Sequence, residues 1–137
     1  MRRASDVDIV VATDGSEAAS RGVDHALAIA ETWDATVHAL TVMPVPDGCA
    51  TALPSAGRDR SDRRGQALVL SVAARALDRD LCAETAVRYG RPHRVIASYA
   101  DEVDANLIVL GGREDADYQG SMASRVATAT DRNVAPM

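Results

Sequence analysis

Residues 7–13 read VDIVVAT, and this uninterrupted apolar run has the length of one strand. A run without polar alternation is typical of a parallel strand that helices cover on both faces. The turn at residues 14–16 (Asp-Gly-Ser) follows, and its serine is placed to cap a helix that is expected to end near Trp33. A second β-rich run, ATVHALTVM at residues 35–43, completes a βαβ unit, whose crossover is expected to be right-handed.

The rest of the chain continues this alternation of strands and helices. A loop rich in proline and glycine at residues 44–57 precedes a helix that is expected to begin at Ser61. An alternating strand at residues 82–89 is expected at a sheet edge, and Pro92 suits the first position of the next helix. The apolar stripe predicted for the helix from Ser61 comprises Leu70, Ala74, Leu77 and Leu81. The later elements are a helix carrying Val95, Ile96, Tyr99, Ala100 and Val103, a strand at 106–111 and a last helix from 121 to about 131.

Four strands that alternate with four helices predict an α/β fold, an open and doubly wound parallel sheet with helices on both faces. A length of 137 residues fits a single domain, 1–137. Only residues 133–137 remain where such a chain would form a fifth strand, so that strand is expected to be absent or incomplete. Either the domain is truncated, or a partner or a neighbouring segment covers the exposed sheet edge beside the fourth strand.

Composition and charge exclude several classes of protein. A formal net charge of -5 and a pI near 5.1 argue against a nucleic-acid binder, which needs a basic face. All 15 basic residues are arginines, so mechanisms that need a lysine are excluded. Cys49 and Cys82 have neither disulfide-framework nor zinc spacing, and no stretch approaches the roughly 18 apolar residues of a membrane span. A cytoplasmic protein without a membrane or nucleic-acid partner is expected.

Residues 106–126, NLIVLGGREDADYQGSMASRV, place a glycine turn between a strand and a helix start. Gly111 follows the strand and Gly120-Ser121 opens the helix, an arrangement that binds phosphate groups in many proteins. Between them the chain carries one basic and three acidic residues: Arg113, Glu114, Asp115 and Asp117. Carboxylates repel a triphosphate strongly where the dielectric constant is low. The scaffold therefore indicates a nucleotide site, whereas the side chains that line it oppose one.

Three segments resemble a known family: IVVATDGSEAASRGVDHALAIA at 9–30, YGRPHRVIASYADEVDANLIVLG at 89–111 and GSMASRV at 120–126. In their order and spacing, the chain resembles the universal stress protein (UspA-like) family over nearly its whole length. The resemblance implies a sheet ordered 3-2-1-4-5, often dimeric through the fifth strand. Because that strand is expected to be absent or incomplete here, the order predicted for this chain is 3-2-1-4. The dimer that is usual in the family is therefore in question here, and the partner expected from the topology is a homodimer or heteromer through an exposed sheet edge.

Nucleotide-binding members of this family carry a glycine, two residues, a second glycine, nine residues, then glycine with serine or threonine. Gly111 and Gly120-Ser121 match the first and last positions, but Glu114 replaces the second glycine and the loop is four residues shorter. The resemblance also places Asp14 and Val42 where family members meet adenine and ribose. ATP or another adenine nucleotide is therefore expected to bind weakly or not at all. The residues predicted to contact it are Asp14, Val42, Gly111, Gly120 and Ser121.

The function that the resemblance implies is a non-catalytic binding and regulatory module of the stress response. The alternative is a functional adenine-nucleotide-binding protein with slow phosphate hydrolysis, which would need a metal and basic groups on the phosphates. Asp14 suits turn formation equally well, and the glycines also suit a turn between strand and helix. The arginine-rich segment 58–64 is interpreted as a solvated helix start because acidic residues interleave its arginines. The histidines lack zinc spacing, so no metal site is predicted.

Overall fold

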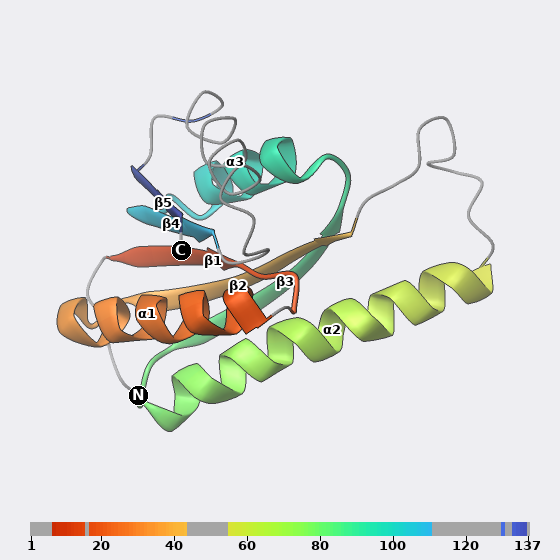
Figure 1. The fold of residues 1–137 in the computed structure, drawn as a ribbon. Helices are drawn as coiled ribbons and strands as arrows, with labels where there is room; N and C mark the ends of the chain where they lie inside the picture. The colour runs from red at the N-terminus through yellow and green to blue at the C-terminus, as the bar shows by residue number, and fades with distance from the viewer. Residues whose placement is uncertain (1–6, 16, 44–54, 111–129, 131–132, 137) are drawn as a thin grey trace.

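The computed structural model describes residues 7–15, 17–43, 55–110, 130 and 133–136. They form a parallel sheet in the order β3-β2-β1-β4-β5 with helices on both faces (Figure 1), which confirms the predicted fold class and the order 3-2-1-4. The strands are β1 (Asp8–Ala12), β2 (Thr36–Met43), β3 (Ala83–Tyr89), β4 (Leu107–Leu110) and β5 (Asn133–Pro136). The helices are α1 (Glu17–Trp33), α2 (Ser55–Asp78) and α3 (Pro92–Glu102).

A short fifth strand lies at one edge of the sheet. β5 pairs in parallel with β4 and is four residues long, so the expected fifth strand is incomplete and not absent. The edge strand beside β4 is therefore β5, while β3 forms the opposite edge, as predicted for residues 82–89. The last helix, predicted from 121 to about 131, lies outside the described residues apart from Thr130.

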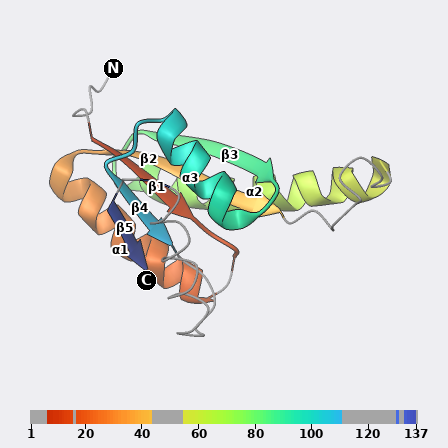
Figure 2. The ribbon, with the colours of Figure 1, turned by 90° about the horizontal axis from the view of Figure 1, so that it is seen from above.

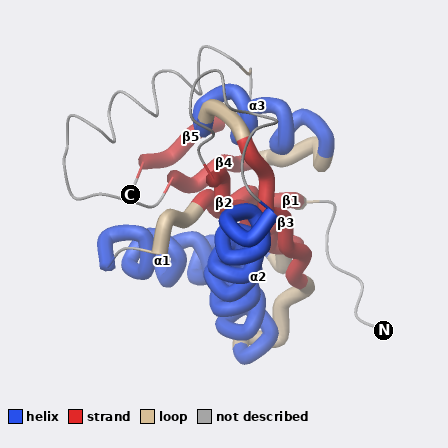
Figure 3. The backbone as a smooth tube through the Cα atoms, turned by 90° about the vertical axis from the view of Figure 1, so that its right-hand side faces the viewer, coloured by secondary structure: helices blue, strands red, loops and turns tan. Residues whose placement is uncertain are grey.

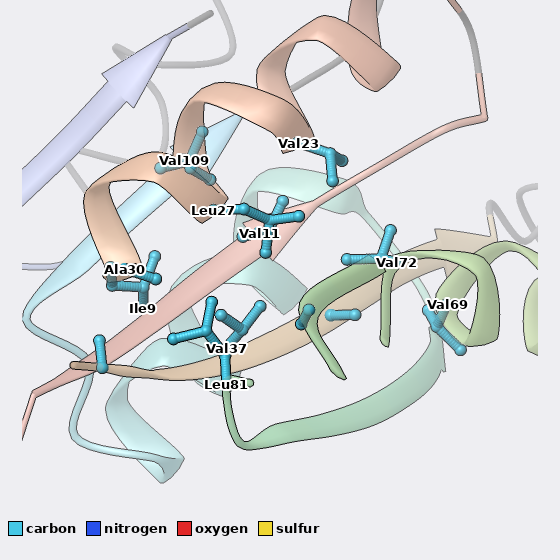
Figure 4. Packing of buried hydrophobic residues seen from close by; sticks show 14 residues of the cluster. Ile9, Val11, Val23, Leu27, Ala30, Val37, Val69, Val72, Leu81 and Val109 are labelled. Atoms are coloured by element: carbon cyan, nitrogen blue, oxygen red, sulfur yellow. The ribbon is translucent and has the colours of Figure 1, made fainter. Parts of the chain in front are cut away.

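β1 separates two hydrophobic cores, because successive side chains of a strand point to opposite faces of the sheet. Ile9 and Val11 pack in a core with α1 and α2 (Figure 4), whereas Val10 and Ala12 pack with α3 on the other face. Figure 2 shows α3 over the sheet, with α1 and α2 beneath it. Ile9, Val10 and Val11 are each 0% exposed. The uninterrupted apolar run at 7–13 is thus a strand covered on both faces, as expected.

Each of the three described helices ends in a turn in which an aspartate adopts a left-handed conformation. Asp34, Asp80 and Asp104 have φ angles of 54°, 64° and 57°. The residue after each aspartate donates its backbone N–H to the carbonyl five positions earlier, at 2.9–3.0 Å, which defines a Schellman motif. Those following residues, Ala35, Leu81 and Ala105, are buried. The motif therefore stops each helix and directs the chain into the next strand.

The structure corrects two predictions about α2. The helix begins at Ser55, six residues before the expected start at Ser61, and so includes the arginine-rich segment 58–64. The predicted core-facing stripe was wrong: Leu70 is 56% exposed and Leu77 is 63% exposed. Ala74 is exposed as well, and of the four predicted residues Leu81 alone is buried. The side chains of α2 that pack against the sheet side are Val69, Val72, Ala73 and Ala76.

Small residues face the sheet because α2 approaches it closely. Gly65 is buried, and a Cβ atom there would lie 2.7 Å from Val87 Cγ1 and 3.3 Å from Thr41 Cγ2. Valine and threonine are stiff at χ1, so neither neighbour can move aside easily. The missing side chain of Gly65 therefore sets the distance between α2 and strands β2 and β3.

Replacing Gly65 with leucine is expected to lower the free energy of unfolding by roughly 1–3 kcal/mol, because an overpacked core displaces its neighbours. Leucine is a better helix former than glycine, so helix propensity alone would raise stability. Gln66→Leu is the matched control, since Gln66 is exposed on the same turn. Urea unfolding of both variants checks the prediction, and equal stabilities would contradict it.

Polar groups cluster between α3 and the sheet, around Tyr99. The Tyr99 ring is 6.3 Å from the His38 ring, edge to face, and the Arg88 guanidinium is 5.1 Å from the Tyr99 ring centroid. His38 Nε2 lies 2.9 Å from Asp8 Oδ1 and ties β2 to β1. Burial, and then the negative charge of Glu84, raise the pKa of Tyr99 above 10.0, while Arg88 acts in the opposite direction.

Because the pKa of Tyr99 is raised in the folded state, the stability that its neutral phenol contributes is present below about pH 10. That contribution is lost as the pH rises through the raised pKa. The free energy of unfolding is therefore expected to fall above about pH 10 in the unaltered chain and to fall less in Tyr99→Phe. Urea unfolding across this pH range measures the difference, with Tyr89→Phe as the control. Identical pH profiles for the unaltered chain and Tyr99→Phe would refute it.

Candidate functional site

The predicted site lies where the parallel strands end. Ala12 is paired with Leu40 of β2 on one side and with Leu110 of β4 on the other. Asp14 and Val42 each come two residues beyond this level, so they lie together where the carboxyl-terminal ends of the strands meet. The chain leaves β1 toward α1 on one face and reaches β4 from α3 on the other face. The gap between β1 and β4 is therefore a topological switch point, where open α/β sheets bind ligands.

The structure places part of the predicted site. Asp14 is exposed, and Val42 is half-buried against the core beneath α3. These two residues, expected on the base side, thus share one edge of the sheet. The residues predicted for the phosphate side lie outside the described residues, as does the acidic segment between them: Gly111, Gly120, Ser121, Arg113, Glu114, Asp115 and Asp117.

Two threonines that were not predicted from the sequence join the end of β1 to β2. The backbone N–H of Thr13 donates to the Leu40 carbonyl at 2.9 Å, and Thr41 Oγ1 donates to the Thr13 carbonyl at 2.8 Å. Thr13 Oγ1 accepts the backbone N–H of Gly15 at 3.2 Å. Both threonines are buried, at 8% and 2% exposure. The available signal was a threonine near the end of each of these two predicted strands.

Gly15 is needed at the turn after β1. Its φ of +83° is a conformation that residues with a side chain rarely adopt. A Cβ atom there would also lie 2.6 Å from Leu68 Cδ2 of α2. The turn that presents Asp14 is therefore held by the backbone of Gly15 and by the two threonines.

A small cavity of about 150 Å³ opens beside this turn, between α1 and α2. Nucleotide-sized ligands occupy pockets of about 300–1,000 Å³, so this cavity alone does not hold one. Arg75, the basic residue that lines it, already donates to Ser20 and pairs with Asp24. The residues lining the cavity are Thr13, Gly15, Ser20, Val23, Leu68, Ser71, Val72 and Arg75.

Among the described residues, no group of three or more histidine, cysteine, aspartate or glutamate side chains is arranged to hold a metal ion. Within the same residues, no helix is both long and apolar enough to cross a membrane.

Comparison with known protein families assigns this chain to one of them. Residues 8–135 match the Universal stress protein family. This chain therefore belongs to that family, as its three characteristic segments predict.

Individual relatives support the same assignment. The universal stress protein MJ0531 of Methanocaldococcus jannaschii is 30% identical over 127 residues, which cover 86% of this chain and 74% of that protein. A solved universal stress family protein from Burkholderia pseudomallei has a TM-score of 0.78 at 25% identity, over 95% of this chain and 94% of that one. The universal stress protein from Archaeoglobus fulgidus, solved in complex with dAMP, has a TM-score of 0.72 at 25% identity, over 95% and 96% of the chains.

Replacing Thr41 with valine is expected to lower the free energy of unfolding by roughly 1–3 kcal/mol, because the buried Thr13 carbonyl loses a hydrogen bond. Valine keeps the shape of the side chain, so the loss reports mainly on the hydroxyl. Thr85→Val on β3 is the control, since Thr85 is exposed. Thermal and urea unfolding provide the measurement, and a Thr41→Val variant as stable as the unaltered chain would disprove this role.

Proposed function

We propose that this chain is a non-catalytic binding and regulatory module of the stress response. Its binding of ATP is weak or lost. The observation that carries the proposal is a mismatch within one site. Asp14 and Val42, which are expected on the base side, lie at the carboxyl-terminal ends of β1 and β2, while the segment expected to bind phosphate is short and acidic in sequence.

The base side is supported by the arrangement at the edge of the sheet. Asp14 is exposed on a turn whose geometry Gly15 and Thr13 fix, and Val42 is a half-buried apolar residue at the same end of the sheet. An aspartate can accept hydrogen bonds from ribose hydroxyls, and an aliphatic side chain can pack against a base. The Archaeoglobus fulgidus relative that binds dAMP supports an adenine nucleotide as the ligand class.

The phosphate side argues for weak binding of the triphosphate. Glu114 stands where the family motif has a glycine, so a charged side chain replaces a position that allows close backbone approach. Asp115 and Asp117 add further negative charge, with Arg113 as the single basic residue of the segment. Repulsion grows with the charge of the ligand, so ATP is penalised more than AMP.

Calorimetric titration with ATP and AMP, each with and without Mg²⁺, tests this proposal. We expect AMP to bind at least as tightly as ATP, and Asp14→Ala to weaken both. Glu114→Gly combined with four inserted neutral residues is expected to raise ATP affinity by about tenfold or more, equal to about 1.4 kcal/mol. Glu114→Gln separates the charge from the backbone effect. Micromolar or tighter ATP binding by the unaltered chain would overturn the proposal.

Slow phosphate hydrolysis is the second candidate, and the acidic segment is the feature that favours it. Glu114, Asp115 and Asp117 supply oxygen ligands of the kind that Mg²⁺ prefers. A metal held there would offset the repulsion and activate water. Metal-dependent release of ADP from ATP distinguishes this candidate from a binding module, and a chain that releases no ADP would rule out slow hydrolysis.

The cytoplasmic location of the protein stays a prediction.

A further inference from the structure

The exposed side of α2 carries a regular apolar stripe. Ala67, Leu70, Ala74 and Leu77 are all exposed, and the two leucines are 56% and 63% exposed. We name these four residues the outer stripe. Their spacings of three, four and three residues repeat every seven residues, which is the pattern of a helix-pairing seam.

The outer stripe faces away from α1 and from the sheet. Arg75 and Arg79 bond to Asp24 and Glu31 of α1, and these arginines lie on the far side of α2 from the stripe. The sheet-facing residues Val69, Val72 and Ala76 lie beside those arginines on the helix. Figure 3 shows α1 and α2 side by side beneath the sheet, and Figures 1 and 2 show the amino-terminal part of α2 extending past it. A second helix can therefore lie along the stripe without meeting α1 or the sheet, as far as the described residues extend.

Charge is divided between the two ends of the stripe. Arg63 and Arg64 are exposed at its amino-terminal end, while Asp78 and Asp80 are exposed at its carboxyl-terminal end. Negative charge at the carboxyl end of a helix is unfavourable, because the helix dipole is negative there. A parallel second helix would place arginine beside arginine and aspartate beside aspartate. An antiparallel copy of α2 would place arginines beside aspartates at both ends.

We propose that α2 is an interface between two copies of this chain, which pair antiparallel along the outer stripe. The two-fold axis passes near position 72, so that Leu70 of one copy faces Ala74 of the other, and Ala67 faces Leu77. The small alanines receive the leucines, and Arg63 and Arg64 lie close to the other copy's Asp78 and Asp80. From position 63 to 78 the contact runs for about 22 Å, at 1.5 Å per helical residue. This surface is separate from the sheet edge at β5 and from the nucleotide site.

Sedimentation equilibrium of the full chain gives the first test. The unaltered chain is expected to be dimeric at micromolar concentration, and Leu70→Glu to raise the dissociation constant by about tenfold or more. Ala28→Glu places the same charge on an exposed residue of α1 and is expected to leave the dimer unchanged. Circular dichroism checks that both variants are folded, as expected for exposed sites. A monomeric unaltered chain, or a dimer that Leu70→Glu leaves intact, would overturn the proposal.

A charge exchange tests the antiparallel direction. Arg63→Glu and Asp78→Arg are each expected to weaken self-association, and an equal mixture of the two is expected to form heterodimers, because each contact then joins opposite charges. Arg94→Glu on α3 is the matched control and is expected to behave as the unaltered chain. Failure of the mixture to associate more tightly than either variant alone would overturn antiparallel pairing. Val134→Pro disrupts β5 at the sheet edge, and loss of the dimer in Val134→Pro but not in Leu70→Glu would assign the dimer to that edge and overturn the proposal.

Discussion

The burial of β1 on both faces is the constraint on which the rest of the structure depends. Its side chains pack alternately into the two hydrophobic cores, and its backbone pairs with β2 and β4. The register that results puts Ala12 level with Leu40 and Leu110, and so fixes which residues emerge together at the end of the sheet. Thr41 can reach the Thr13 carbonyl only in this register. The position of Asp14 is therefore a consequence of how β1 is packed.

Much of this fold follows from the sequence because the central strands are runs of mostly apolar and β-branched residues. The runs at 7–13, 35–43 and 106–111 correspond to β1, β2 and β4 within two residues at each end. The alternation at 82–89 likewise placed β3 at an edge, where one side of a strand meets solvent. The start of α2 was misplaced because proline, glycine and alanine precede Ser61, and the backbone nevertheless becomes helical at Ser55.

The orientation of α2 could not be read from periodicity, because the helix has two apolar stripes. One contains leucines and alanines, and the other contains Val69, Val72, Ala73 and Ala76. Hydrophobicity favours the leucines, but close approach at Gly65 leaves room only for smaller side chains. The location of Asp14 and Val42 at the same end of the sheet was predictable, since each comes at the end of a predicted strand. The threonine hydrogen bonds were not, because they depend on the register between two strands.

The three aspartates that end the helices have a consequence for how the chain tolerates change. Left-handed backbone is easier for glycine than for aspartate, and a carboxylate sits poorly beside the last carbonyls of a helix. On backbone conformation alone, glycine would therefore be less strained than aspartate at positions 34, 80 and 104. Such positions leave unused stability in the fold, of the kind that proteins retain when selection requires only sufficient stability. The junctions between helices and strands, more than the tightly packed centre, are where this domain has latitude to evolve greater thermal resistance.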